Sequence, residues 1–498
     1  MIKTILEPAR NIDVIRQTDV LVVGSGPGGL AAALASARAG VETTLLERYG
    51  CFGGNITQVG VEGFAWYRHP ETIDSEGIGR EFEERAKSMG AAMPEPQSIS
   101  HSLDSEAFKF VADTLVEEAG VIPMLHRLCV APIMEGNMIR GVIVESKAGR
   151  EAILAKRVID ATGDADIAHR AGAPTHMHPV DEMMSVSVMF SMCGVNKTRF
   201  IDAVKADPQT YGDWAVGGEW EVITSGKEDA MFSPFLRKPF QKALEAGLIP
   251  DSVKTMAGTW GTVSDQGDLT YLNMCHLYLN GTDPDALTHG EMAGRKQAMH
   301  AIAALQAFMP GCEEAKLRNF GMTLGIRDTR KIDAVYNMTA DDVMEQGRFD
   351  DSIGIFHEFI DGYGYLILPT TGRYFHLPYR SMLPKNVRHL ITAGRVIGGD
   401  KVSHAAVRNM MCCAVAGQGA GVAGARILGR GRCARAPAPR AQGRGLSTAA
   451  GSLATLTSRI CRFLTPEKLL IIDAGWRVVG STHDEIISIA PKNQAERC

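Results

Sequence analysis

The sequence lacks the features that would mark a membrane, secreted or metal-binding protein. No uninterrupted apolar run reaches the ~18 residues that span a bilayer. The N-terminal stretch MIKTILEPARNIDVIRQ is interrupted by charged residues, so it has no continuous apolar core of a secretory signal. The ten cysteines are scattered without a C-x-x-C pair, and His176 and His178 have no carboxylate or cysteine at ligand spacing. We therefore expect a cytoplasmic protein with reduced thiols, no membrane insertion and no metal.

The chain also lacks an excess of positive charge. Its net charge is −5 at pH 7, whereas nucleic-acid-binding proteins carry a basic surface. We therefore expect a small-molecule substrate and no nucleic acid. The length of 498 residues suits either two domains or one domain split by an insertion.

One segment lacks acidic residues altogether. Between Lys401 and Pro466 there is no Asp or Glu, while arginines crowd a stretch rich in Gly, Ala and Pro. Residues 426–498 are therefore interpreted as an atypical basic tail that is poorly ordered. The composition suits either a flexible segment for an acidic partner or a reading-frame change in GC-rich DNA, and we favour the second.

Glycine, by contrast, is concentrated near the N-terminus. A β-branched run ending at Val23 leads into G-x-G-x-x-G, an Ala-rich helix and a second strand that ends on Glu47. This order is that of a dinucleotide-binding fold, in which the glycine turn and helix N-terminus hold a pyrophosphate and the acid accepts ribose hydroxyls. The predicted turn residues are Gly24, Gly26, Pro27, Gly28 and Gly29.

A second glycine-rich segment, RYGCFGGNIT, follows Glu47 directly. An NAD-binding unit needs little after its acidic residue. A longer ligand that lies across the sheet needs another stretch of bare backbone. The two segments together predict that the ligand is FAD.

With Glu47, this segment reads E-R-x-G-x-x-G-G-x-x-T and resembles the FAD-dependent oxidoreductases related to fumarate reductase flavoproteins. The resemblance continues through AKRVIDATGDADIAHRAGAP, GIRDTRKI, LPYRSMLP and the stretch from Asn386 to Ala425. It implies that FAD is the cofactor and is bound by further residues in these motifs. They are Arg48, Gly53, Gly54, Asn55, Thr57, Thr162, Gly163, Asp164, Gly394, Arg395, Gln418 and Gly419.

The expected fold class is α/β, with a discontinuous Rossmann-like FAD-binding domain and an inserted α+β cap domain. We assign 1–166 and 385–425 to the FAD-binding domain and 167–384 to the substrate-binding insertion. An amphipathic helix is expected over 104–120, with a stripe of apolar residues on one face. In the insertion, strands are expected within 183–195 and 268–281, and a helix is expected to open with the capping box Thr288-x-x-Glu291.

Candidate catalytic residues lie where the insertion meets the cofactor domain. His404 and Arg408 match an H-x-x-x-R element of the family, and His404 is interpreted either as the proton carrier or as a structural histidine that bridges backbone. Arg408 and Arg327 are candidate anchors for a substrate anion, and Tyr379 and Arg380 could line the site. For Arg330 we favour a salt bridge to Asp328 or Asp333.

The leading interpretation is an FAD-dependent dehydrogenase or reductase that passes a hydride between a small polar or anionic substrate and flavin N5. A flavin enzyme with net isomerase or lyase chemistry remains an alternative, as does a flavin-binding electron-transfer protein. The sequence names neither the substrate nor the electron acceptor. A homo-oligomer is compatible with it.

Overall fold

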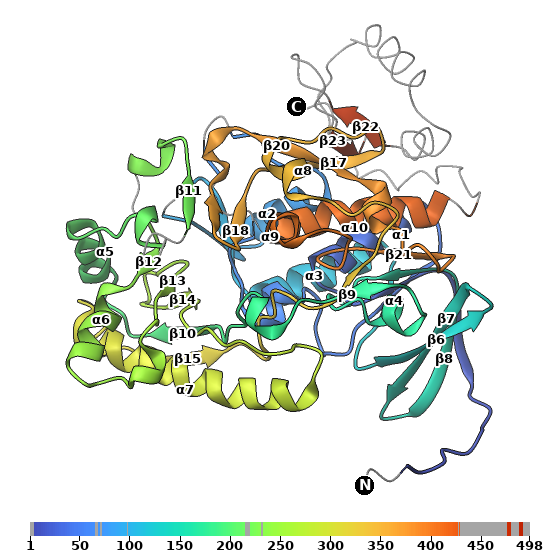
Figure 1. Cartoon of the computed structure of the whole chain (residues 1–498), viewed down its shortest axis with the longest axis horizontal. Helices are drawn as coiled ribbons and strands as arrows, with labels where there is room; N and C mark the ends of the chain where they lie inside the picture. Colours follow the sequence, from blue (N-terminus) through green and yellow to red (C-terminus); the bar gives the residue numbers. More distant parts are fainter. Residues whose placement is uncertain are drawn as a thin grey trace, which may run out of the picture.

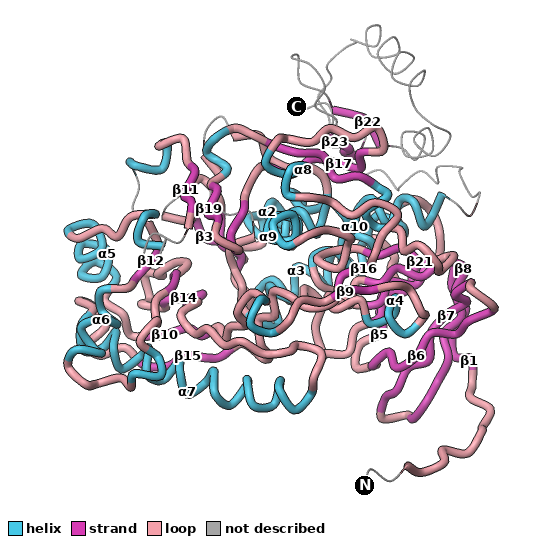
Figure 2. Tube along the Cα trace, viewed as in Figure 1, coloured by secondary structure: helices cyan, strands magenta, loops and turns pink. Residues whose placement is uncertain are grey.

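The computed structural model describes residues 4–64, 68–69, 72–96, 98–214, 220–230, 233–426 and 428, and the backbone of 476–479 and 488–491. Figures 1 and 2 show a main sheet with its helices at one side and a second group of helices and short strands at the other. Beyond Leu428, the expectation of a poorly ordered tail lies outside the described residues, apart from the strands β22 (Trp476–Val479) and β23 (Ser488–Pro491). Within the described part of the chain, no helix is long and apolar enough to cross a membrane.

The main sheet has seven strands in the order β5-β2-β1-β8-β7-β6, with β21 also paired to β8. β5, β2, β1, β8 and β21 run parallel, and β8, β7 and β6 form an antiparallel meander. Val20–Val23 at the buried end of β1 form a continuous apolar run because both faces of the parallel sheet are covered. The bounds are β1 Val14–Val23, β2 Thr43–Leu46, β5 Ile122–Met124, β6 Leu128–Glu135, β7 Met138–Ser146, β8 Gly149–Asp160 and β21 Leu390–Thr392.

Small residues let two helices approach each other closely beside this sheet. In Figure 1, α10 (Met410–Arg426) lies next to α1 (Pro27–Arg38) although the two are far apart in sequence. A Cβ on Gly417 would lie 1.9 Å from the carbonyl oxygen of Gly28, and one on Gly421 would lie 2.2 Å from that of Ala32. The late segment of the chain therefore completes the core begun by the N-terminal unit.

The amphipathic helix is confirmed as α3 (Ala107–Glu118), and the expected apolar stripe is its buried face. That stripe consists of Phe108, Val111, Ala112, Leu115 and Val116. The same core contains α2 (Ile78–Ser88) and residues from 338–382, including Phe356 and Phe375. Residues within 167–384 thus pack with the cofactor part, and the division at 384 stays a prediction.

A second core is built from residues between 186 and 324. Its sheet has the order β14-β10-β15, and the expected strand segments contribute β10 and β14. The long helix α7 (Pro284–Phe308) starts earlier than expected, and the proposed Thr288 capping box is wrong. Asp283 accepts hydrogen bonds from the Asp285 and Ala286 amides, and Pro284 occupies the first turn, which makes a stronger start.

The remaining elements are short. The helices are α4 Asp166–Arg170, α5 Lys197–Ala206, α6 Lys238–Glu245, α8 Ala340–Met344 and α9 Lys401–Val407. The strands are β3 Ala92–Pro94, β4 His101–Leu103, β9 Thr175–His176, β10 Phe190–Cys193, β11 Glu221–Ile223, β12 Phe235–Leu236, β13 Gly258–Thr259, β14 Leu269–Leu272, β15 Lys316–Phe320, β16 Lys331–Ile332, β17 Ser352–His357, β18 Ile360–Gly362, β19 Tyr365–Ile367 and β20 Tyr374–Pro378.

Candidate functional site

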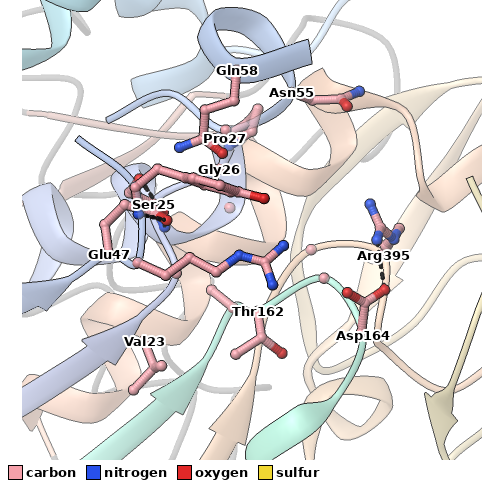
Figure 3. A pocket seen from close by; sticks show the side chains of 18 of the residues that line it. Val23, Ser25, Gly26, Pro27, Glu47, Asn55, Gln58, Thr162, Asp164 and Arg395 are labelled. Atoms are coloured by element: carbon pink, nitrogen blue, oxygen red, sulfur yellow. Dashed lines mark hydrogen bonds and ion pairs between the residues drawn. The ribbon is translucent and has the colours of Figure 1, made fainter. Parts of the chain in front are cut away.

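A cavity of about 180 Å³ lies where the carboxyl ends of β1, β2, β8 and β21 meet, which is where open α/β sheets bind ligands. We call it the glycine cavity. Figure 3 shows its wall, formed by residues from several separate segments. Those segments include Gly24–Gly28, Glu47 to Tyr49, Gly54–Asn55, Ala161–Asp164 and Ala393–Arg395.

The glycines at this cavity have distinct roles. A Cβ on Gly29 would lie 1.8 Å from the carbonyl oxygen of Gly24, so this position lets the helix pack against the turn. A Cβ on Gly26 would have no atom within 4 Å, which leaves open space beside its backbone for a ligand. A Cβ on Gly54 would lie 2.4 Å from Gly26 Cα, and Gly54 has φ +52°. The second glycine-rich segment therefore lacks a side chain at Gly54 because its backbone packs against that of the first.

Glu47 is fixed at the cavity by hydrogen bonds from the glycine turn. Its side chain is buried, and Oε2 accepts from the Ser25 amide at 3.0 Å and from Ser25 Oγ at 2.6 Å, as Figure 3 shows. Oε1 accepts from the Tyr49 amide at 3.0 Å. Arg48, also on the wall, is exposed and lies 4.8 Å over the Tyr49 ring. A carboxylate held in this way is a pre-positioned acceptor for ligand hydroxyls.

The loop after β8 is tied to the loop after β21. Asp164 accepts from Arg395 Nη2 at 2.7 Å, as Figure 3 shows. It also accepts from Thr329 Oγ1 at 2.7 Å. Thr162 donates through Oγ1 to buried Asp160, whose other oxygen accepts from two amides at the start of α4. Burial raises the pKa of Asp160. Gly163 has φ +83°, so the turn between these residues favours glycine.

Five residues expected at the cofactor do not line this cavity, and one of them is Gly29, whose packing against Gly24 is described above. The Thr57 hydroxyl donates to Phe52 O at 2.6 Å, and Gly53 lies beside Thr57. Gln418 accepts from the Ile78 amide at 2.7 Å and so caps α2, while Gly419 faces Ile353. Gln418 and Gly419 do not line the cavity because only the first turn of α10, at Met410 and Cys413, faces it.

A second cavity of about 820 Å³ lies beside the first. The two share Asn55, Ile326, Arg408 and Met410 among their lining residues. Aromatic side chains are numerous on its wall, so we call it the aromatic cavity; they include Phe64, Trp214, Trp220, Phe235, Phe356 and Phe359. Arg327, Tyr271, His276 and Tyr363 supply polar groups.

Arg327 and Arg408 both line the aromatic cavity, but their partners differ. Arg408 Nη2 donates to Asp361, at 2.5 Å to the carbonyl and 3.2 Å to the carboxylate. Arg327 donates to Ser185 O, Ser187 Oγ and Asn273 Oδ1, and no described carboxylate lies within salt-bridge distance of it. Burial, together with the nearby Arg408, lowers the pKa of Arg327.

The other arginine of the motif has a structural partner. Arg330 pairs with Asp166 at 2.5 Å and donates to Asp164 O, so the expected bridge to Asp328 or Asp333 is wrong. Residues far apart in sequence form the bridge because the loop after β8 lies against this segment.

His404 lies behind the cavity, and it is absent from the lining residues of both cavities. Its Nε2 is 3.0 Å from Arg327 O, and because a carbonyl only accepts, this nitrogen carries the hydrogen. Burial lowers the pKa of His404 well below its usual value, with neighbouring Lys331 adding to the effect. Of the two interpretations of His404, this geometry fits the structural histidine that bridges backbone.

Tyr379 and Arg380 also lie away from both cavities. They belong to the short 3₁₀ turn Tyr379–Met382. Arg380 pairs with Asp351 at 3.0 Å, about half exposed, and its guanidinium lies 5.1 Å over the Tyr336 ring. Arg380 is thus exposed and Tyr379 is half-buried against the main core, and neither lines the two cavities.

Sequence reasoning missed two groups. Arg127, which lines the glycine cavity, follows His126, a residue with φ +57° and no motif around it. Tyr363 lines the aromatic cavity, and its hydroxyl donates to Asp328. Asp328 also pairs with buried Lys331. Burial alone would raise the pKa of Asp328, but His404 and Lys331 lower this pKa to about 2. Only the spacing of Asp328 and Lys331 was visible in the sequence.

The histidines near residue 176 have ordinary contacts. His176 Nε2 lies 3.2 Å from Gly399 O, and the rings of His176 and His178 are 6.2 Å apart. Among the residues with described positions, no three His, Cys, Asp or Glu side chains are grouped to hold a metal ion.

Comparison with known proteins identifies relatives of several parts of the chain. A sequence model of the family described as FAD dependent oxidoreductase matches residues 19–436. Thiamine thiazole synthase from Metallosphaera sedula is 36% identical over 163 residues, which cover 30% of this chain and 55% of that protein. The enzyme of that name from Saccharolobus islandicus is 32% identical over 163 residues, covering 30% and 57%. This chain therefore spans about half the length of the curated relatives it matches.

Solved structures give a more distant likeness over a longer stretch. A geranylgeranyl bacteriochlorophyll reductase-like protein from Thermoplasma acidophilum covers 83% of this chain, and 79% of that chain is covered. The two are 14% identical, and the TM-score is 0.43.

Proposed function

The chain belongs to the FAD-dependent oxidoreductase family, and from this premise we propose that it transfers a hydride between an organic substrate in the aromatic cavity and N5 of FAD. The observation that carries the proposal is the junction of the two cavities through shared lining residues. A cofactor whose nucleotide half occupies the glycine cavity then extends toward the place where a substrate is enclosed. The kinship with fumarate reductase flavoproteins stays a prediction.

FAD is the cofactor of this family, and the residues of the glycine cavity fit it. The open space beside Gly26 admits a pyrophosphate, and the free amides at the start of α1 favour its charge. Glu47 is fixed to accept ribose hydroxyls. When bound, FAD supplies the hydride acceptor or donor.

The chain's own residues provide anion binding and proton movement in this proposal. Arg327 holds an anionic group of the substrate, since its guanidinium faces the aromatic cavity without a carboxylate partner among the described residues. Tyr363 replaces His404 as the residue proposed to handle the substrate's proton. Its hydroxyl donates to Asp328, so its oxygen accepts a hydrogen bond from the substrate's reacting hydroxyl group and orients the proton that leaves with the hydride. His404 is a positioning residue that holds the backbone of Arg327.

The proposal is tested by anaerobic reduction of the bound flavin. The purified protein is mixed with organic acids and alcohols, and bleaching of the flavin absorbance is followed. With a substrate found in this way, Tyr363→Phe should slow bleaching by ~10²–10⁴-fold. The matched control, Arg380→Met, changes an exposed residue that lines neither cavity and should leave the rate unchanged. A protein that releases no FAD on denaturation, or Tyr363→Phe with the wild-type rate, would contradict the assignments.

A further inference from the structure

The aromatic cavity is large, and aromatic and methionine side chains make up much of its wall. Its volume of about 820 Å³ falls in the range of ~300–1,000 Å³ that encloses drug-sized ligands. Trp214 stacks on Phe235, with ring centroids 5.3 Å apart and an angle of 28° between their planes. Trp214 Nε1 is already bonded to Ser233 Oγ at 2.8 Å, so its ring offers the cavity mainly apolar surface.

Methionines add to this surface. Those that line the cavity are Met183, Met184, Met189, Met410 and Met411. Their flexible thioether chains adapt to irregular apolar ligands and make favourable contacts with aromatic rings. A ligand that covers the aromatic and methionine side chains therefore displaces water from a wide apolar wall.

The charges on the wall are unequally neutralised. Lys401 is paired with Glu182, and Arg408 is paired with Asp361. The remaining lining carboxylate, Asp181, is exposed. Arg327 is the cation on this wall for which the described residues provide only neutral acceptors.

Arg327 also retains hydrogen-bonding capacity. Of the five N–H groups of a guanidinium, Nη1 uses two and Nη2 uses one. The Nε–H and one Nη2–H therefore have no partner in the described part of the chain. Two donors of one planar guanidinium match the two oxygens of a carboxylate. Arg327 follows Ile326, which lines both cavities, so this group lies near their junction.

We propose that the substrate is an aromatic carboxylate, whose acid group binds Arg327 and whose ring system packs against the aromatic wall. That the ligand is a substrate rests on the proposed function. The binding of an aromatic carboxylate in this cavity does not depend on it. The aromatic carboxylate keeps the anionic group of the small polar or anionic substrate expected from the sequence, but the rest of the molecule is larger and mainly apolar. His276 is neutral in this site, because burial lowers its pKa to about 4 and both ring nitrogens have partners, at Ala257 O and Ser185 Oγ. Beside Arg327, His276 therefore adds no second cation that lacks a carboxylate partner.

The test measures binding without turnover. The FAD-loaded protein is titrated in a calorimeter with 1-naphthylacetate, its neutral amide 1-naphthylacetamide, and succinate. We expect the naphthyl acid to bind at least ~10-fold more tightly than either of the others. Succinate binding as tightly as the naphthyl acid, amide binding equal to acid binding, or no measurable binding of the naphthyl acid would each overturn the proposal.

Variants separate the two halves of the ligand. Arg327→Met should remove the preference for acid over amide, and Trp214→Ala should reduce the preference for the naphthyl acid over succinate by ~10-fold. Arg199→Met is the control, because Arg199 is exposed and paired with Glu313 away from the cavity. Unchanged preferences in both site variants would overturn the assignment. The wild-type comparison of acid with amide remains decisive if a variant fails to fold. A protein that binds these probes but never reduces its flavin would refute the proposed function and leave this inference intact.

Discussion

The two cavities are built by different means although they share a junction. The glycine cavity is shaped largely by backbone, with glycines at the points where two segments approach closely. The aromatic cavity is shaped by large side chains from segments as far apart as Phe64 and Met411. The first arrangement suits a cofactor held by common backbone groups, whereas the second allows the substrate to differ while the cofactor stays the same. The predictions below test whether this contrast holds.

The largest expected effect comes from the buried charges behind the aromatic cavity. Lys331→Met leaves Asp328 without its cation in a fully buried position, so the free energy of unfolding should fall by about 3–5 kcal/mol. The measurement is urea unfolding of the wild type and the variant. The control is Lys385→Met, which breaks an exposed pair with Asp333 at 2.8 Å and should cost no more than about 1 kcal/mol. Equal losses of unfolding free energy in both variants would contradict the expected difference between the buried and the exposed ion pair.

Glu47→Ala tests whether the glycine cavity depends on any side chain. It removes a fixed carboxylate and its bonds to Ser25 and Tyr49, so FAD affinity should fall by ~10- to 100-fold. The measurement is FAD rebinding to apoprotein, followed by quenching of flavin fluorescence. Glu42→Ala changes an exposed residue just before β2 and serves as the control. Wild-type affinity in Glu47→Ala would mean that backbone alone holds the nucleotide.

Two glycines close together in the same turn should respond differently to the same substitution. In Gly29→Ala the new methyl group meets Gly24 O, so stability should fall by about 1–3 kcal/mol. In Gly26→Ala the methyl group enters open space, and φ is −60°, so the apoprotein should keep its stability and retain less FAD. Thermal unfolding of the apoproteins and the ratio of flavin to protein after gel filtration measure the two effects. A stable Gly29→Ala, or FAD retention as in the wild type by Gly26→Ala, would contradict this division.

The same contrast explains what the sequence could predict. The glycine turn, Glu47 and the buried stripe of α3 depend on local spacing, and the α/β fold class with its FAD-binding family is confirmed. Arg327 and Arg408 both line the aromatic cavity, and their role in substrate binding stays a prediction; the partners of Arg327 come from 185–187 and 273. No local pattern specifies such contacts.

The misplacements have related causes. Gln418 and Gly419 lie on the same helix as cavity residues. Successive residues of a helix point in different directions, however, and these two face α2 and Ile353. Tyr379 and Arg380 were chosen for their place in a motif, while Tyr363, which reaches the cavity, lies outside every motif. Side chains that line the aromatic cavity are brought together by tertiary packing, and periodicity reports only which face of an element is buried.

The last prediction concerns Glu62, whose carboxyl group joins β14 of the second core to the segment before α3 of the main core. Its carboxyl group accepts from Thr270 Oγ1 in β14 at 2.6 Å and from the Ser105 amide before α3 at 3.3 Å. Burial raises the pKa of Glu62 from 4.5 to about 7. Because the folded protein holds this proton more tightly than the unfolded chain does, the stabilisation from Glu62 is full below pH 4.5 and is lost as the pH rises toward 7.

Glu62→Gln is neutral at every pH and so should remove this dependence. Measured by urea unfolding, the stability of the variant relative to the wild type should increase from pH 5 to pH 7, by at most about 1.4 kcal/mol per pH unit for one proton, and should then level off. Glu95, whose pKa burial raises to about 8, is present in both proteins and is removed by the comparison at each pH. A difference that is constant across this range would mean that Glu62 is ionised in the folded protein. The contact between Thr270 and Glu62 would then join the two regions through a charged hydrogen bond rather than a protonated one.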